Sequence, residues 1–119
     1  MLGFGSKKLM ASLGVDEAAW ERFRLEKAEK HGRVGFNIAI TQNWVCYDDG
    51  WRKALFPLGE IVSFSKEYRE PFYGNATARF YVTLKFRNGS TFDLPCEFRE
   101  LDKIAALLAE RCPQAGKQG

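Results

Sequence analysis

The sequence predicts an α+β domain, mainly β, in which a bent antiparallel sheet or partly open barrel of about six to seven strands is capped by a C-terminal helix. Two patterns predict this fold class. Between residues 34 and 94, apolar side chains recur at every second position, which is the period of a strand with one buried face. After Pro95 the period becomes that of an amphipathic helix. The apolar face of this closing helix carries Leu101, Ile104, Ala105, Leu108 and Cys112.

The length and composition are those of one folded domain. The chain has 119 residues, of which 45% are apolar, and this is enough to bury a core without disulfides or a metal. An additional N-terminal helix is predicted by strong helix formers, with Asp16 as its cap and Gly32 as its stop. We therefore divide the chain into a flexible leader (1–15), an N-terminal helix (16–31), the barrel with its closing helix (32–113) and a frayed tail (114–119).

Strands are predicted at residues 34–41, 44–48, 51–56, 60–66 and 79–86, followed by a return strand that contains Phe92 and Leu94. The register of the last hairpin follows from parity, because apolar residues must meet across the strand pair. A three-residue loop at 87–89, with Gly89 in the left-handed conformation, meets this condition. It pairs Leu84 with Phe92 and Val82 with Leu94.

Four segments carry the strand, turn and helix signals of a known family. They are Ile40-Thr41-Gln42-Asn43-Trp44-Val45, Pro57-Leu58-Gly59-Glu60-Ile61-Val62, Phe80-Tyr81-Val82-Thr83-Leu84 with Asn88-Gly89, and Leu101-Asp102-Lys103-Ile104 continuing to Cys112-Pro113. Across residues 34–113 this order resembles the bacterial pleckstrin-homology-like (PH-like) domains. The resemblance implies a strongly bent sheet plugged by one helix. Lipid-binding relatives carry cations around the first hairpin loop, whereas no Lys or Arg occurs between Val34 and Trp51, so we expect no phosphoinositide binding.

Charge and cysteine usage narrow the classes of function. The 18 lysine and arginine residues against 15 aspartate and glutamate residues leave a net charge of +3, which is too balanced to indicate nucleic-acid binding. Three cysteines without C-x-x-C spacing predict neither a disulfide framework nor a zinc site, and they favour a reducing, cytoplasmic location. No segment has the pattern of a signal peptide or a membrane span.

No catalytic, cofactor or metal-binding motif emerges, so we expect a protein that is not an enzyme and has no cofactor. The single histidine, His31, falls at the predicted end of the N-terminal helix, where a partial positive charge favours the helix dipole. Acidic residues near the turns are interpreted as solvated side chains rather than as a site for a hard cation. They are Asp48, Asp49, Glu60, Glu67 and Glu70.

Three aromatic residues of one hairpin are candidates for partner binding. Trp44, Tyr47 and Trp51 flank a turn that is predicted at 48–50, where Gly50 supplies the positive φ. Such a group is either part of the core or an exposed recognition surface.

A second candidate is a basic and aromatic face on the strand at 79–86. Arg79, Tyr81 and Lys85, with Arg87 after them, suit single-stranded nucleic acid or an acidic peptide. The alternative is an ordinary solvent-exposed face, because Asp93 across the hairpin partly neutralises it.

The leading hypothesis is a non-enzymatic interaction module that binds a protein segment at a sheet edge or in the groove beside the closing helix. One alternative is a small molecule or lipid held in the barrel, and another is weak nucleic-acid binding through the Arg79, Lys85 and Arg87 face. The N-terminal helix carries a short apolar stripe around Trp20 and Phe23, which either packs on the barrel or captures a second copy of the chain to form a homo-oligomer.

Overall fold

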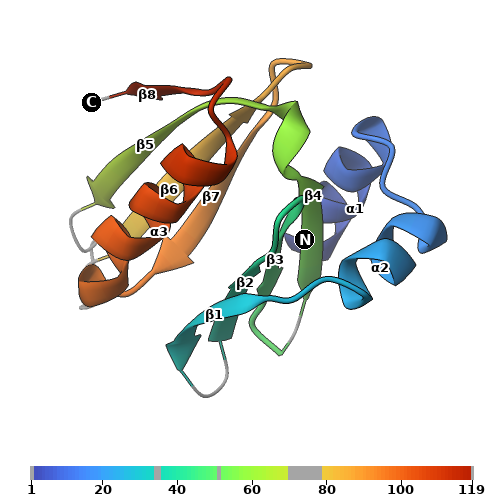
Figure 1. Ribbon diagram of the computed structural model, residues 1–119, viewed down its shortest axis with the longest axis horizontal. Coiled ribbons are helices and arrows are strands. Elements are labelled where there is room, and N and C mark those ends of the chain that lie inside the picture. The colour runs from blue at the N-terminus through green and yellow to red at the C-terminus, as the bar shows by residue number, and fades with distance from the viewer. Residues whose placement is uncertain (1, 34–35, 51, 70–78, 119) are drawn as a thin grey trace. The chain divides into compact units, whose positions relative to one another are not determined.

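The computed structural model describes residues 2–33, 36–50, 52–69 and 79–118, with side chains described at 6–31, 37–50, 52–68 and 80–115. The chain separates into two compact units, Met1–Glu60 and Ile61–Gly119, and each is built around its own sheet (Figure 1). The structure is α+β and mainly β, as predicted. The strands that it describes form two separate sheets and no closed barrel, where the sequence predicts a single bent sheet.

The first unit combines two helices with a four-stranded antiparallel sheet in the order β1-β2-β3-β4. Its elements are α1 (Leu2–Ser12), α2 (Glu17–Arg24), β1 (Glu29–Arg33), β2 (Phe36–Ile40), β3 (Trp44–Asp48), β4 (Lys53–Pro57) and the 3₁₀ turn η1 (Leu58–Glu60). Each strand pairs with the next one along the chain, so the sheet is a meander. The pairing places Ile38 opposite Tyr47 and Val45 opposite Phe56.

Both faces of this sheet are apolar. One face carries the fully buried residues Ile38, Ile40, Val45, Ala54 and Phe56. The other face carries Trp44, Cys46 and Leu55, which form a cluster with Ala19 of α2. Met10, Val15, Trp20 and Phe23 pack against this cluster from α1, α2 and the link between them. Strands that are buried on both faces read as continuous apolar runs, and for this reason β3 and β4 show little alternation in the sequence.

The N-terminal residues form a helix, and the predicted flexible leader at 1–15 is wrong over residues 2–12. The helix α1 packs against β4, where the Leu55 amide donates a hydrogen bond to Met10 Sδ at 3.2 Å. The contact with an apolar sheet face stabilises a segment that its glycines would disfavour as an isolated helix.

The predicted helix at 16–31 is shorter than expected. Asp16 caps it as predicted, because its carboxylate accepts a hydrogen bond from the Ala19 amide at 3.0 Å. The helix α2 ends at Arg24, and its stripe with Trp20 and Phe23 packs on the sheet of its own chain.

The residues that follow α2 form a strand, which the sequence did not indicate. Glu29–Arg33 is β1, in which His31 lies opposite Ile38, so His31 does not stand at a helix end. Glu and Lys favour helices, but the edge of β2 offers hydrogen-bond partners to the whole backbone segment, and pairing outweighs a weak local propensity.

The second unit is a four-stranded sheet in the order β7-β6-β5-β8 with α3 across one face (Figure 1). Its elements are β5 (Ile61–Arg69), β6 (Arg79–Phe86), β7 (Thr91–Cys96), α3 (Phe98–Arg111) and β8 (Gly116–Gln118). The predicted register is confirmed, since Leu84 lies opposite Phe92 and Val82 opposite Leu94. Gly89 has a φ of 89°, which is the left-handed conformation that the three-residue loop requires.

The closing helix is confirmed as α3. Ile104, Ala105 and Leu108 are buried along its inner face, and Cys112 is buried directly after it. The helix packs against β5 and β6. The sheet face on that side carries the buried residues Phe64, Val82, Leu84, Phe86 and Leu94.

The predicted frayed tail is also wrong, because residues 116–118 pair in parallel with β5 as β8. Ser63 lies opposite Gly116, and the Gln114 side chain donates a hydrogen bond from Nε2 to the carbonyl of Ile61 at 3.3 Å. The outer edge of β5 would otherwise present unpaired backbone groups, and even a polar tail satisfies them.

Shortening one buried side chain of α3 tests this core. We expect Ile104→Ala to lower the free energy of unfolding by about 2–5 kcal/mol, because the fully buried side chain leaves a cavity. Lys103→Ala, at an exposed position of the same helix, serves as the control and should change it by less than about 0.5 kcal/mol. Urea denaturation followed by far-UV circular dichroism measures both; equal effects would contradict the assigned helix face.

Candidate functional site

The basic and aromatic face that the sequence predicts on β6 carries exposed cations, but carboxylates lie among them. Tyr81 and Lys85 lie on the same side of the sheet, away from α3, and Lys85 and Arg87 are exposed. The Arg79 side chain lies outside the described side chains. Carboxylates stand between these cations: Glu67 lies opposite Tyr81, and Asp93 accepts a hydrogen bond from Thr83 at 2.9 Å.

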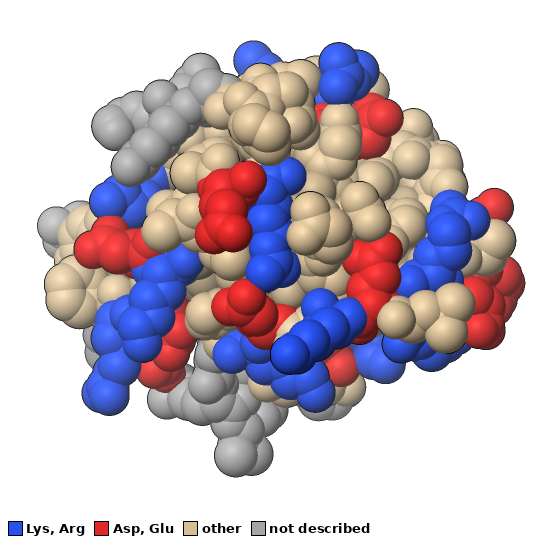
Figure 2. All heavy atoms as spheres, in the orientation of Figure 1, with Lys and Arg blue, Asp and Glu red and all other residues tan. Residues whose placement is uncertain are grey.

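Charges of both signs also alternate over the face of the molecule drawn in Figure 2, where lysine and arginine side chains border aspartate and glutamate. A nucleic-acid surface needs cations clustered along a phosphate track. On the β6 face itself, Glu67 and Asp93 stand beside the cations, so the ordinary solvent-exposed alternative describes it better than the nucleic-acid alternative.

The structure separates the aromatic residues of the β3–β4 hairpin. Trp44 and Tyr47 are only 7% and 4% exposed, and they point to opposite faces of the sheet. Trp44 belongs to the cluster beneath α2, with the Arg22 guanidinium 5.7 Å from its ring centre. Trp51 lies outside the described residues. Of the two alternatives for this group, the burial of Trp44 and Tyr47 favours packing.

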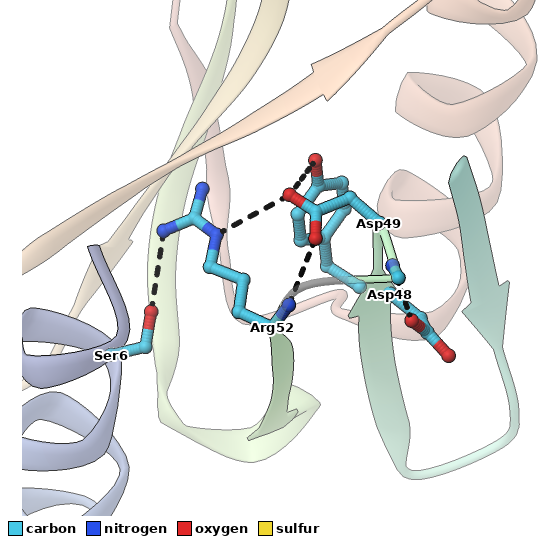
Figure 3. A network of polar contacts seen from close by, with 6 residues as sticks. Ser6, Asp48, Asp49 and Arg52 are labelled. Atoms are coloured by element: carbon cyan, nitrogen blue, oxygen red, sulfur yellow. Dashed lines mark hydrogen bonds and ion pairs between the residues drawn. The ribbon is translucent and has the colours of Figure 1, made fainter. Parts of the chain in front are cut away.

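A polar network holds the β3–β4 turn in place (Figure 3). The Tyr47 hydroxyl donates to Asp49 Oδ2 at 3.1 Å, while Asp49 Oδ1 accepts from the Arg52 amide at 2.9 Å. The Arg52 guanidinium lies 3.8 Å from Asp49 Oδ2 and donates from Nη1 to the Ser6 hydroxyl at 3.4 Å. Gly50 completes the predicted turn with a φ of 90°. The acidic turn residue Asp49 therefore ties the hairpin to α1 through Arg52.

The phenol of Tyr47 should make stability depend on alkaline pH. Burial and, after it, the Asp49 carboxylate raise the pKa of Tyr47 from 10.0 to about 12. Because the folded state binds this proton more tightly, the stabilisation is complete below pH 10 and is lost as pH rises toward 12. We expect the stability of the wild type to fall relative to Tyr47→Phe over that interval in urea titrations. A difference that is independent of pH would contradict the assignment.

All three cysteines are thiols in buried positions. Burial raises the pKa of Cys46, Cys96 and Cys112 to about 11 in each case. A thiol with such a pKa is almost entirely protonated near neutral pH, whereas a nucleophilic cysteine needs a lowered pKa. None of the three has the chemistry of an activated nucleophile.

Thiol labelling tests this conclusion. At pH 8, where a thiol with a pKa of about 11 is protonated, we expect the native protein to react with Ellman's reagent far more slowly than the chain unfolded in guanidinium, which should release three equivalents. A rapid native-state reaction at any one cysteine, assigned by mass spectrometry, would show an accessible thiolate.

Three aromatic rings that the sequence analysis did not single out form an exposed stack in the second unit. Tyr68 of β5, Phe80 of β6 and Phe98 of α3 contribute one ring each, and we call them the aromatic ladder. The ring centres of Tyr68 and Phe80 are 5.0 Å apart, and those of Phe80 and Phe98 are 5.2 Å apart. Both spacings are typical of attractive aromatic pairs. Even so, Phe98 is 71% exposed and Tyr68 is 50% exposed.

The sequence contains a signal for this ladder. Tyr68 continues the alternation of Phe64 and Lys66 past the predicted strand end, and it lies opposite Phe80. Phe98 precedes Leu101 by three residues, so it extends the apolar stripe of the closing helix by one turn. The sequence pattern does not show that Tyr68 and Phe98 lie at the ends of the sheet and of the helix, where they stay exposed.

Charges of both signs adjoin Phe98 at the start of α3, where the sequence is Glu97-Phe98-Arg99-Glu100. Glu97 precedes Phe98, and Glu100 lies near enough to Cys96 to contribute, after burial, to its raised pKa. Cys96 itself lies opposite Phe80 across the sheet. Farther along α3, Asp102 is bound to Lys66 of β5 at 2.8 Å, which joins the helix to the strand.

Within the described part of the chain, no group of three or more His, Cys, Asp or Glu side chains is placed to hold a metal ion. No helix among those residues is long and apolar enough to cross a membrane. The chain matches no protein-family model, no curated protein and no solved structure.

Proposed function

We propose that this protein is a non-enzymatic interaction domain, and that its aromatic ladder binds a short segment of another protein. The observation that supports the proposal is the exposure of Phe98 and Tyr68 in a stack that is already assembled. The site lies beside the closing helix, which is one of the two places where the sequence analysis expects a partner.

The ladder has the physical properties of a binding hot spot. Fully burying a Phe-sized side chain contributes about 1.5–3 kcal/mol, and most of that gain is still unrealised for Phe98. Aromatic anchors dominate the energetics of many protein interfaces. Because the three rings come from β5, β6 and α3, the backbone positions them before a partner arrives, and little ordering entropy is lost on binding.

The residues next to Phe98 carry charges of both signs: Glu97 and Glu100 are acidic, and Arg99 is basic. We propose that an Arg or Lys side chain of the partner meets one of these carboxylates and an aromatic face of the ladder. A cation over such a ring contributes about 0.5–1 kcal/mol at an exposed site. We therefore propose a segment that combines an apolar or aromatic side chain with a neighbouring Arg or Lys.

We also propose that the chain is a bacterial PH-like domain. The order of a four-stranded meander, three further antiparallel strands and a closing helix supports it. Three buried thiols suit a reducing environment, so we propose a cytoplasmic location. The aromatic ladder itself requires neither proposal.

Selection from a random peptide library tests the ladder. We expect peptides selected on the folded domain to share an aromatic or aliphatic residue next to Arg or Lys. A synthetic peptide of this kind should bind Phe98→Ala and Tyr68→Ala at least about tenfold more weakly in fluorescence polarisation, because each variant removes an anchor.

Leu25→Ala is the matched control, since Leu25 is also an exposed large apolar residue but belongs to the first unit. Both ladder positions are exposed, so their variants should melt like the wild type. Undiminished affinity in both ladder variants, or the same loss in the Leu25→Ala control, would overturn the proposal.

A further inference from the structure

Among the described residues of the first unit, helices and sheet enclose a larger and a smaller cavity. The larger one, which we call the α1 cavity, has a volume of about 600 Å³. Its walls include Lys7, Met10, Val15, Trp20, Arg52 and Lys53. The smaller one, the α2 cavity, has a volume of about 240 Å³ and shares Trp20 and Lys53 with the first. Small-molecule sites typically measure about 300–1,000 Å³, so the α1 cavity has the size of a ligand site.

The titratable side chains of the α1 cavity are all cations. Lys7 comes from α1, Lys53 is the first residue of β4, and Arg52 directly precedes that strand. Among the described residues, no carboxylate lies within ion-pair distance of Lys7. Lys53 Nζ is 4.0 Å from Asp48, and at this distance an exposed pair is worth little. Arg52 is already paired with Asp49, so the positive charge that the chain leaves largely uncompensated in this cavity is that of Lys7 and Lys53.

Arg52 is held in a fixed position at the wall of the α1 cavity. Figure 3 shows its guanidinium between the Ser6 hydroxyl and the Asp49 carboxylate. The same group lies 5.3 Å from the centre of the Tyr47 ring. A cation that is oriented in advance loses little entropy when it meets an anion, which is the usual arrangement of a binding site.

An apolar surface adjoins these cations. Met10, Val15 and Trp20 are partly buried against the cluster on the sheet, so they form a supported wall rather than loose side chains. Trp20 also makes an edge-on contact with Phe23, with ring centres 6.3 Å apart. One side of the cavity is thus apolar and packed on the sheet, and the other is cationic.

We propose that the α1 cavity binds a small organic anion with an apolar body. The body packs on Met10, Val15 and Trp20, while a carboxylate, sulfonate or phosphate group meets Lys7, Arg52 and Lys53. The α2 cavity also carries cations, but its volume of about 240 Å³ lies below the usual range of ligand sites, so it is the poorer site for such a ligand. This site belongs to the first unit and does not depend on the aromatic ladder.

Two dyes of nearly equal shape test the proposal. Anilinonaphthalene sulfonate carries an anionic group, and phenylnaphthylamine is its uncharged counterpart; both gain fluorescence in an apolar site. We expect saturable binding of the sulfonate by the native protein. The double substitution Lys7→Gln with Lys53→Gln should weaken it about tenfold, because two charge-assisted contacts are lost.

The controls separate charge from folding. Lys85→Gln removes an exposed lysine of the second unit and should leave sulfonate affinity unchanged, whereas Lys7→Arg keeps the charge and should retain it. Thermal melts confirm that each variant is folded. The proposal is overturned if the uncharged dye binds as tightly as the sulfonate, if the double variant keeps its affinity, or if no saturable binding occurs. Binding to anionic lipid vesicles without binding of the soluble sulfonate would likewise overturn it.

Discussion

The structure of the first unit depends on a sheet that is apolar on both faces. Trp44, Cys46 and Leu55 project to the side opposite Ile38 and Val45, and a two-sided sheet of this kind needs cover on each side. Leaving such a face in water costs about 25 cal/mol for each Å² of apolar surface. The N-terminal helices cover the face of Trp44, Cys46 and Leu55, where Ala19 of α2 is fully buried. This requirement explains why a glycine-containing segment is helical at all.

The two helices cover this sheet face incompletely. The candidate ligand site lies in one of the cavities that they leave. Two short helices cannot fill the whole area above four strands, so cavities remain on both sides of Trp20. Lysine side chains can lie at the edge of such a cavity, because the aliphatic stem packs on apolar surface while the charged group reaches solvent. In the second unit, α3 begins level with the row of Tyr68, Phe80 and Cys96, and the aromatic ladder stays exposed at that end.

Neither candidate site is marked by a sequence motif. Neither contains an activated nucleophile, since the pKa of each cysteine is raised by burial. The polar network of Asp49 and Arg52 gives the β3–β4 turn a structural role, and the same arginine faces the α1 cavity. A side chain that is fixed for structural reasons is thereby available as a pre-oriented binding group.

The sequence by itself determined β6, the register of Leu84 with Phe92, the left-handed Gly89 and the apolar face of α3. These features depend on short-range periodicity and turn chemistry, which neighbouring residues encode completely. Only the tertiary structure decided that α1 is a helix, that 29–33 and 116–118 are strands, and that the strands form two sheets. Those outcomes depend on which strand edge or sheet face, remote in the sequence, lies close in space. Periodicity indicates which side chains are buried, but not the element against which they pack. The exposure of Phe98 and the burial of Trp44 were also decided by the tertiary structure, because the local sequence pattern of an aromatic residue is the same whether the ring is buried or exposed.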